Sequence, residues 1–411
     1  MVKSAHKILP IIIWKIDIMR VAVTQFATSS DTQENLATCI RVINEAAGCE
    51  PSLIVLPEFC NTQPCYKDHN QAWNEALAID GTFLQRIAEQ AQQHNCYIVL
   101  NVTLRRDLLR NHQDGSIKSN ISVTSCLFSP QGKLIQEEDK QTLSGYENEF
   151  FISASRASEV AITPFGKLGL LSGGDDMSYT IPRGLSLNGA QLLCHSMGSF
   201  ALDQSRLHGP SRANENNVFL ASANKVGSLA SEEQGRIFSE KSAIPQKDIV
   251  GIGQSQIVSP KGKVLAQISN NEEGTTFADI DLAEGHLNNK RRPDGTEFIS
   301  QRRPELYQAL TPLGQESAQQ EDINQVPTTA NVAIFATYKS SEQAIEDVCH
   351  YIENNLSDII QLPELFFIAD KTVLNNAQQL ASLTCLSQQL IKQVSTALRP
   401  FQYVCTSLII D

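Results

Sequence analysis

The feature that most limits the possible fold is an alternation of short apolar strands with amphipathic helical segments. Residues 20–26 alternate in polarity and are rich in valine, which predicts a strand. Residues 32–47 carry apolar side chains at the spacing of one helix face, and Asp31 precedes them as the expected N-cap. Such alternation of β and α predicts a sheet covered by helices.

The same analysis extends along most of the chain. Pro57 ends a short apolar run that has the character of a buried strand. A Ser-Pro-Lys-Gly turn at 259–262 predicts a hairpin between its flanking strands. Further strands are predicted at residues 53–56, 97–102, 121–128, 168–171, 191–195, 218–223, 252–258, 264–268 and 276–280, and further helices at 84–93 and 181–187.

The pattern begins again after a polar, aperiodic segment, residues 311–330, which is typical of a linker. Beyond it, Ile-Ile-Gln-Leu-Pro-Glu at 359–364 repeats Leu-Ile-Val-Leu-Pro-Glu at 53–58. In both copies the next predicted strand begins 39 residues after the glutamate, at Tyr97 and at Tyr403. Equal spacing of this kind indicates an internal duplication, of which the second copy holds only the first part.

These boundaries predict a division of the chain into four parts. An apolar run at residues 9–14 is interrupted by Pro10 and is far shorter than a membrane span, so it is assigned to an extension outside the fold. The parts are an N-terminal extension (1–18), a first domain (19–310), a linker (311–330) and a partial second copy (331–411).

Charge and cysteine content exclude several classes of function. A net charge of −12 argues against a surface for nucleic acid or anionic membranes. The ten cysteines show neither a CxxC pair nor zinc-ligand spacing, which predicts reduced thiols in a cytoplasmic protein without a metal site. Gly173 and Gly174 are followed by Asp175 and Asp176, whose carboxylates would repel a phosphate.

Several motifs follow one another in a fixed order along the first domain. The motifs are Leu-Pro-Glu-Phe at 56–59, Phe-Ser-Pro-Gln-Gly at 128–132 with Asp139 and Lys140, Gly-Tyr-Glu-Asn-Glu-Phe-Phe at 145–151, Ser-Arg-Ala-Asn-Glu-Asn at 211–216 with Ala-Asn-Lys-Val-Gly at 223–227, and Arg-Arg-Pro-Glu-Leu-Tyr at 302–307. Together they resemble the nitrilase superfamily of carbon–nitrogen hydrolases. The motifs at 145–151 and 302–307 resemble its carbamoyl-amidase-like members.

The resemblance implies a fold and a chemistry. The expected fold is α/β, a four-layer α-β-β-α sandwich over residues 19–310, followed by the partial second copy. The expected ligand is a small amide, N-carbamoyl or nitrile compound, with no cofactor and with homodimers as the usual assembly. In such enzymes a thiolate attacks the substrate carbon, a carboxylate moves the protons and an ammonium stabilises the tetrahedral oxygen.

The same resemblance assigns residues to these roles. Glu58 matches the general base and Lys140 the ammonium, while Glu147, or less favourably Glu149, would orient the lysine or a water. Asp175 is expected to be a buried hydrogen-bonding residue of the scaffold.

The position of the nucleophile departs from the family pattern. The family segment Gly-x-x-x-Cys-x-Asp corresponds to Gly-Leu-Leu-Ser-Gly-Gly-Asp at 169–175, so the cysteine position falls on Gly173. Loss of a covalent nucleophile can cost on the order of a millionfold in turnover, against about 10²–10⁴-fold from acid–base catalysis. Ser172 is expected on the opposite face of its strand, Cys194 in the core, and Cys60 near the cleft at most.

Three functions therefore stay open. The chain could be a carbon–nitrogen hydrolase that tolerates the change, or a pseudoenzyme that keeps the cleft and binds a small amide or amine. In the third hypothesis the first copy scaffolds the second, where Glu364 corresponds to Glu58. Because the second copy lacks lysine and cysteine segments, it is not expected to be active alone.

Overall fold

The computed structural model divides into two compact units, Met1–Pro304 and Glu305–Asp411. The N-terminal extension and the linker expected from the sequence lie almost wholly outside the described residues. The residues that the structure describes are 18–63, 65–110, 117–242, 244–269, 271–307, 330–336, 342–368, 376–398 and 402–409.

The first unit contains two six-stranded sheets. In the first sheet the strand order is β14-β1-β2-β3-β4-β5, and β1, β2 and β3 run parallel. The strands are β1 (Met19–Gln25), β2 (Leu53–Val55), β3 (Tyr97–Arg110), β4 (Ile117–Phe128), β5 (Leu134–Asp139) and β14 (Gly274–Ile280).

The second sheet has the order β13-β12-β9-β8-β7-β6, with β7, β8 and β9 parallel. The strands are β6 (Val160–Thr163), β7 (Gly166–Ser172), β8 (Leu192–Ser196), β9 (Phe219–Ala223), β12 (Gln256–Val258) and β13 (Val264–Gln267).

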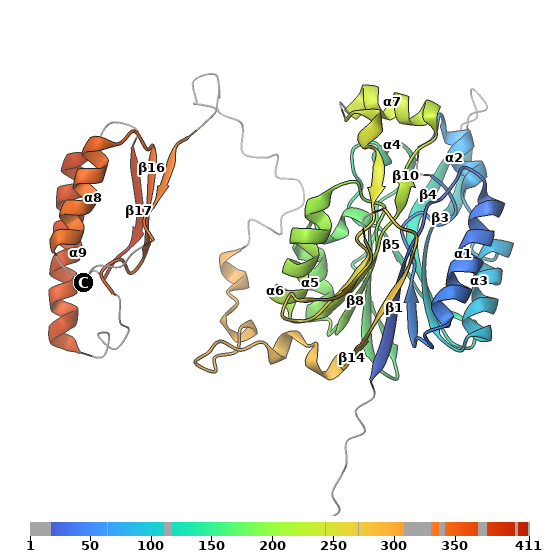
Figure 1. The fold of residues 1–411 in the computed structure, drawn as a ribbon, viewed down its shortest axis with the longest axis horizontal. Helices are drawn as coiled ribbons and strands as arrows, with labels where there is room; N and C mark the ends of the chain where they lie inside the picture. The colour runs from blue at the N-terminus through green and yellow to red at the C-terminus, as the bar shows by residue number, and fades with distance from the viewer. Residues whose placement is uncertain are drawn as a thin grey trace, which may run out of the picture. The chain divides into compact units, whose positions relative to one another are not determined.

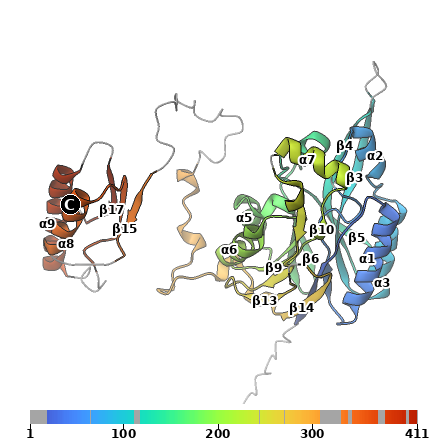
Figure 2. The same ribbon diagram turned by 45° about the horizontal axis from the view of Figure 1, so that its top comes forward.

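Helices cover the outer face of each sheet (Figures 1 and 2). The helices α1 (Thr32–Ala47) and α3 (Thr82–Gln93) pack on the first sheet, and α5 (Thr180–Leu187) and α6 (Gly209–Asn216) pack on the second. A continuous apolar core fills the space between the two sheets. This arrangement confirms the predicted four-layer α-β-β-α sandwich.

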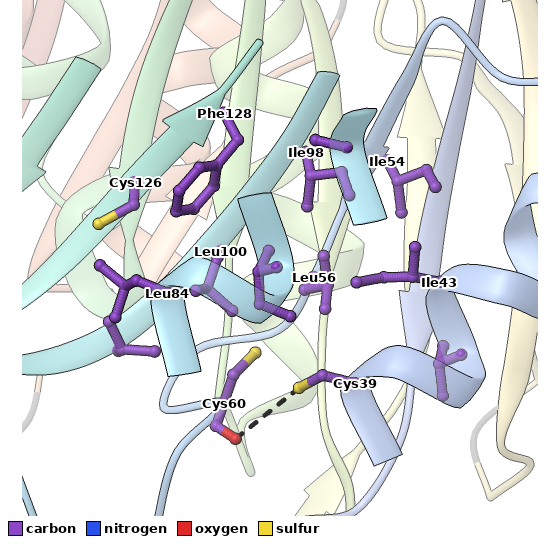
Figure 3. Packing of buried hydrophobic residues seen from close by; sticks show 14 of the residues in the cluster. Cys39, Ile43, Ile54, Leu56, Cys60, Leu84, Ile98, Leu100, Cys126 and Phe128 are labelled. Atoms are coloured by element: carbon purple, nitrogen blue, oxygen red, sulfur yellow. Dashed lines mark hydrogen bonds between the residues drawn. The ribbon is translucent and has the colours of Figure 1, made fainter. Parts of the chain in front are cut away.

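The central strands are buried on both faces, which explains their nearly unbroken apolar sequences. Ile54 and Leu56 point toward α1 and α3, whereas Leu53 and Val55 point into the core between the sheets. Figure 3 shows the helix-side cluster, in which Cys60 packs among the aliphatic side chains.

Asp31 caps α1 as predicted, because its carboxylate accepts hydrogen bonds from the backbone N–H groups of Gln33 and Glu34. The hairpin around residues 259–262 is also confirmed, since β12 and β13 pair antiparallel. The helix that the resemblance implies at 211–216 is present as α6. Several elements were not predicted: α2 (His69–Glu75), β5, α4 (Glu147–Phe150), β6, β10 (Val226–Ser228) and α7 (Glu232–Ser242).

The prediction of one continuous strand over residues 252–258 was wrong. The segment belongs to two strands, β11 (Val250–Ile252) and β12, which lie in different sheets. Between them Gly253 and Gln254 have φ values of 63° and 59°, in the left-handed region. Two such residues in succession break an extended chain, so β11 turns away and pairs with β10.

The second unit repeats the order of the first strands and helices of the first unit. A parallel sheet of β15 (Val332–Ile334), β16 (Ile359–Glu364) and β17 (Tyr403–Ser407) alternates with α8 (Glu342–Asn354) and α9 (Ala377–Ala397). The register agrees too, since Leu53 pairs with Tyr97 in the first unit and Ile359 pairs with Tyr403 in the second. These features are consistent with a partial second copy.

The turn after each Leu-Pro-Glu segment is also the same in the two units. Phe59 and Leu365 both have a φ of 53°. The Phe59 N–H donates to Oδ1 of Asn101 at 3.0 Å, and the Leu365 N–H donates to Oγ of Ser407 at 2.9 Å. Each acceptor lies on the neighbouring parallel strand, so one side chain stabilises the same left-handed turn in both copies.

Within the described ranges, the helices are too short or too polar for any of them to cross a bilayer.

We expect residues 18–307 to fold without the second unit, because all the core clusters of the sandwich draw on residues between Met19 and Leu282. The melting temperature of this fragment, followed by circular dichroism, should lie within about 4 °C of the full chain, equivalent to about 1 kcal/mol. Aggregation or a non-cooperative transition of the fragment would contradict this expectation.

Candidate active site

Glu58 follows the carboxyl end of β2, at the edge where the parallel strands end. Its N–H donates to the carbonyl oxygen of Met197 at 3.0 Å, which joins the two sheets. The left-handed turn at Phe59 then diverts the chain, so the Glu58 side chain stays directed into the interior, where it is 3% exposed.

Lys140 lies directly after β5 and is buried between two carboxylates. Its Nζ donates to Oε1 of Glu58 at 2.9 Å and to Oε1 of Glu147 at 2.6 Å. The second carboxylate oxygen of Glu147 accepts from the N–H and the hydroxyl of Ser144, at 2.8 and 3.0 Å. The buried ammonium therefore forms charge-assisted hydrogen bonds with two separate carboxylates.

Gly173 follows the end of β7 and faces both charged groups. Its φ is 48°, and a Cβ placed there would lie 2.4 Å from Oε1 of Glu58 and 2.5 Å from Nζ of Lys140. Its carbonyl oxygen accepts from Nε2 of Gln204 at 2.7 Å, and Nε2 of His195 lies 2.8 Å from the same oxygen. These contacts to the carbonyl oxygen hold the backbone at Gly173, and its α-carbon lies beside the Glu58–Lys140 pair.

Asp175 ties the Gly173 turn to the segment that follows Lys140. Its Oδ1 accepts from the N–H groups of Gln141 and Thr142, at 3.1 and 2.8 Å, and its Oδ2 accepts from the N–H of Ser172 at 3.3 Å. This is the scaffold role expected for Asp175. Burial raises the pKa of its carboxyl, against the lowering effect of these hydrogen bonds.

The buried charges shift one another's titration. Burial raises the pKa of Glu58 to about 7, although the positive charge of Lys140 opposes the shift. Burial by itself would lower the pKa of Lys140, but the attraction of Glu58 and Glu147 outweighs it and holds that pKa above the ordinary value. The lysine is therefore charged at neutral pH, whereas Glu58 exchanges a proton near neutrality.

Lys225 supports the turn from the opposite side. Its Nζ donates to Oγ1 of Thr28 at 2.7 Å and to the carbonyl oxygens of Phe59 and Thr62, at 3.0 and 3.2 Å. Burial lowers the pKa of Lys225 to about 8. The sequence singled out its Ala-Asn-Lys-Val-Gly motif, but not this contact with the turn after Glu58.

A cavity of about 490 Å³ opens above the charged groups. Four predicted site residues line it together, namely Glu58, Lys140, Glu147 and Gly173. The other lining residues, which the sequence did not single out for this purpose, are Phe59, Cys65, Thr142, Ser144, Tyr146, Gly174, Met177, Gly198, Ser199, Phe200, Ala201, Gln204, Leu229, Phe238 and Ile249.

The alternative residues lie elsewhere. Glu149 is exposed and does not line the cavity. Cys194 is buried between the sheets, and Cys60 packs on the helix side with its thiol directed at the carbonyl oxygen of Pro57, 3.1 Å away. Ser172 Oγ accepts from Nδ2 of Asn101 at 2.9 Å between the sheets. The thiol that does reach the cavity is Cys65, whose pKa burial raises to about 12.

The described part of the chain contains no group of three or more His, Cys, Asp or Glu side chains arranged to hold a metal ion.

Comparison with known proteins agrees with this architecture. The family model for carbon–nitrogen hydrolases matches residues 20–286. A nitrilase from Pyrococcus abyssi is 28% identical over 278 residues, covering 67% of this chain and 94% of that protein. An omega-amidase from Bos taurus is 25% identical over 301 residues, covering 70% of this chain and 96% of that protein.

Solved structures share the fold. The NitFhit protein of C. elegans superposes with a TM-score of 0.56 at 23% identity, covering 71% of this chain and 66% of that one. A mutant amidase of the nitrilase superfamily from Nesterenkonia gives a TM-score of 0.54 at 20% identity, covering 71% of this chain and 97% of that one.

We predict that Cys60 and Cys194 are unreactive in the folded protein, because both side chains are fully buried. The exposed thiols of Cys385 and Cys405 serve as internal controls. With a maleimide probe and peptide mass mapping, Cys60 and Cys194 should be labelled at least about a hundredfold more slowly than Cys385 and Cys405, because labelling of a buried thiol requires local opening. Rapid labelling of Cys60 or Cys194 would reopen the question of an alternative nucleophile.

We predict that Glu58→Gln removes a pH-dependent component of stability. The folded-state pKa of Glu58, about 7, lies above its ordinary value of 4.5, so its contribution is present below pH 4.5 and is lost as the pH rises through 7. Relative to Glu58→Gln, the wild type should lose on the order of 3 kcal/mol of unfolding free energy across that window. Urea unfolding at a series of pH values measures the difference.

The exposed Glu149 provides a matched control, because Glu149→Gln removes one carboxylate from the same region of sequence without touching the buried group. A wild-type curve that runs parallel to that of Glu58→Gln from pH 4 to 8 would show that Glu58 titrates normally.

Proposed function

The chain belongs to the carbon–nitrogen hydrolase family, and from this premise we propose that it binds a small amide or amine without hydrolysing it at an enzymatic rate. In this proposal Glu58, Lys140 and Glu147 are the binding groups at the base of the cavity. Gly173 stands at the position of the missing nucleophile. The protein would then be a pseudoenzyme of the family.

The observation that carries the proposal is the position of Gly173. A Cβ there would lie within 2.5 Å of both a carboxylate oxygen and an ammonium nitrogen. Among the glycines that the structure describes, Gly173 is the one whose Cβ position contacts both Glu58 and Lys140, and it lies in the segment that resembles the family's cysteine segment. Because glycine has no side chain, it cannot form a covalent acyl or thioimidate intermediate.

Two structures of related fold support ligand binding without the thiol. A glutamate-to-glutamine mutant of an amidase from Nesterenkonia, 20% identical to this chain, is described with a covalent addition at its active site cysteine. A cysteine-to-alanine mutant of that amidase is described in complex with butyramide. A complex with an unreacted amide is the state that we propose for this chain.

The relatives also keep a hydrolase function under consideration, since they include a nitrilase and an omega-amidase. For this chain, hydrolysis would require another nucleophile. The buried Cys60 and Cys194 and the hydrogen-bonded Ser172 lie outside the cavity, which disfavours all three.

We further propose that residues 331–411 are a partial tandem repeat of the domain at 19–310, separated by a linker at 311–330. The shared strand order and register support this division. All ten cysteines are free thiols, which favours a cytoplasmic location. We propose a homodimer on the basis of family resemblance.

We predict that the wild type releases ammonia from amides, N-carbamoyl amines and nitriles no faster than the uncatalysed background. The substitution Gly173→Cys should raise turnover by at least about a hundredfold, because a lost nucleophile costs up to about a millionfold. The gain is limited because Glu58 and Lys140 must move to admit the new side chain, although both contacts involve the ends of flexible side chains.

Gly173→Ala is the matched control, since it adds the same Cβ at the same φ without a thiol. It should stay at background, and Glu58→Gln combined with Gly173→Cys should lose the gain. Enzymatic turnover by the wild type would overturn the proposal of a binding protein. Absence of turnover in every variant would count against a hydrolase-derived cavity.

A further inference from the structure

The parallel sheet of the second unit carries its helices on one face. The helices α8 and α9 pack there against Ile360, Leu362 and Val404 (Figure 1). Because successive side chains of a strand point to opposite faces, the residues that alternate with these three point away from the helices. They form two rows across the sheet, which we call the open face: Val332, Ile359 and Tyr403 in the first row, and Ile334, Gln361 and Cys405 in the second.

The open face is exposed to solvent although most of its side chains are apolar. Val332, Ile334 and Tyr403 are 57%, 74% and 60% exposed. Cys405 beside them is exposed as well. Single exposed apolar side chains are ordinary on a protein surface, but adjacent ones form a patch of the kind that marks an interaction site. The open face is therefore a candidate surface for a partner.

The corresponding rows of the first unit are buried. They occupy the same register on β1, β2 and β3, with Val21, Leu53 and Tyr97 in one row and Val23, Val55 and Val99 in the next. All six belong to the core between the two sheets of the sandwich. Tyr97 is 8% exposed there, against 60% for Tyr403. In the first unit this pattern is covered by a second sheet, which indicates a sheet as the occupant of the open face.

The sheet that covers these rows in the first unit is already engaged. Its inward side chains, among them Leu168, Leu192 and Phe219, are buried in the core of the sandwich. A second molecule of this chain, in contrast, supplies an apolar sheet surface that is exposed, namely its own open face. The occupant that fits the open face is therefore the same face of a second copy.

Charge and side-chain size both suit such self-association. The open face contains no Asp, Glu, Lys, Arg or His, so two copies meet without like-charge contacts, although the chain carries a net charge of −12. If the strands of the two copies run in opposite directions, the first row of one copy lies on the second row of the other. Tyr403 then lies opposite Cys405, and Val332 lies opposite Ile334, so that a larger side chain meets a smaller one at each place. The Glu364 carboxylates, at the end of β16, are then at opposite ends of the contact.

We propose that the open face is a self-association surface, on which the sheet of a second copy packs face to face with its strands in the opposite direction. The proposal concerns the second unit and does not depend on the ligand of the cavity. A standard interface buries about 800 Å² on each partner and takes roughly 20–30 residues from each. Six positions make a smaller interface, so we expect weak association that depends on protein concentration.

Two exposed thiols report on the second unit of the full chain. Cys405 lies in the open face, whereas Cys385 lies on α9. Between about 1 µM and about 200 µM protein, a range that brackets a weak interface, the rate of maleimide labelling at Cys405 relative to Cys385 should fall at least about fivefold. The reason is mass action, since Cys405 becomes covered as the second copy binds.

A constant ratio of the two labelling rates across that range would overturn the proposal. Rapid labelling of Cys405 at both concentrations would show that the open face stays uncovered. Slow labelling of Cys405 at both concentrations would show that the open face is covered within one chain.

A pair of matched variants tests the assigned surface. Ile334→Asp places a charge in the open face at a position that is 74% exposed, so the fold of the single chain should persist. Leu356→Asp is the control, because Leu356 is 77% exposed and lies between α8 and β16, outside the open face. By sedimentation equilibrium of the full chain, Ile334→Asp should weaken the association at least about tenfold, since the contact would bury an unpaired charge.

Leu356→Asp should leave the association unchanged, and only Ile334→Asp should remove the concentration dependence of labelling at Cys405. Equal behaviour of the two variants would contradict the proposal. Association through the first unit is common to both variants and to the wild type, so it does not alter the comparison. Far-ultraviolet circular dichroism checks that both variants are folded, and the labelling of the wild type decides the question if either is not.

Discussion

The burial of Lys140 between Glu58 and Glu147 is the interaction on which the rest of the site depends. Removing one unpaired charge from water costs several kcal/mol, so the lysine is tolerable only while both carboxylates stay in contact with it. The three residues come from the ends of β2 and β5 and from α4, so the pairing also fixes how these elements meet. The hydrogen bonds of Asp175 hold the turn at Gly173, and those of Lys225 hold the turn at Phe59. The position of the charged cluster therefore depends on contacts from both sheets.

The charged cluster forms beside Gly173, a residue that has no side chain. Its backbone keeps the left-handed conformation, which glycine adopts without steric cost, and its carbonyl oxygen stays bound to Gln204. Glu58 and Lys140 occupy the space beside its α-carbon and satisfy each other there. Under the proposed function, this chain keeps the architecture of the family without its covalent chemistry.

The residues at the base of the site were predictable from the sequence because each belongs to a short motif at a strand end. Glu58 follows Leu-Pro, and Gly173 lies in a segment of fixed length before Asp175. The walls of the cavity were not predictable, since Leu229, Phe238 and Ile249 reach it only through long-range packing of α7 and its neighbouring loops. The break at Gly253 and Gln254 was missed because the prediction joined Ile252 to Ile257 and Val258 in one strand, although Gly-Gln-Ser-Gln lies between them.

The turn after Leu-Pro-Glu has the same conformation in both units, although the glutamate is buried in one and exposed in the other. Leu365 adopts the same φ as Phe59, and Ser407 replaces Asn101 as the acceptor, yet Glu364 is exposed whereas Glu58 is buried. In both places a polar side chain from the neighbouring parallel strand accepts a hydrogen bond from the turn, whether the preceding glutamate is buried or exposed. Such a turn can persist in a duplicated segment that has no active site, because its conformation does not depend on the function of the glutamate before it.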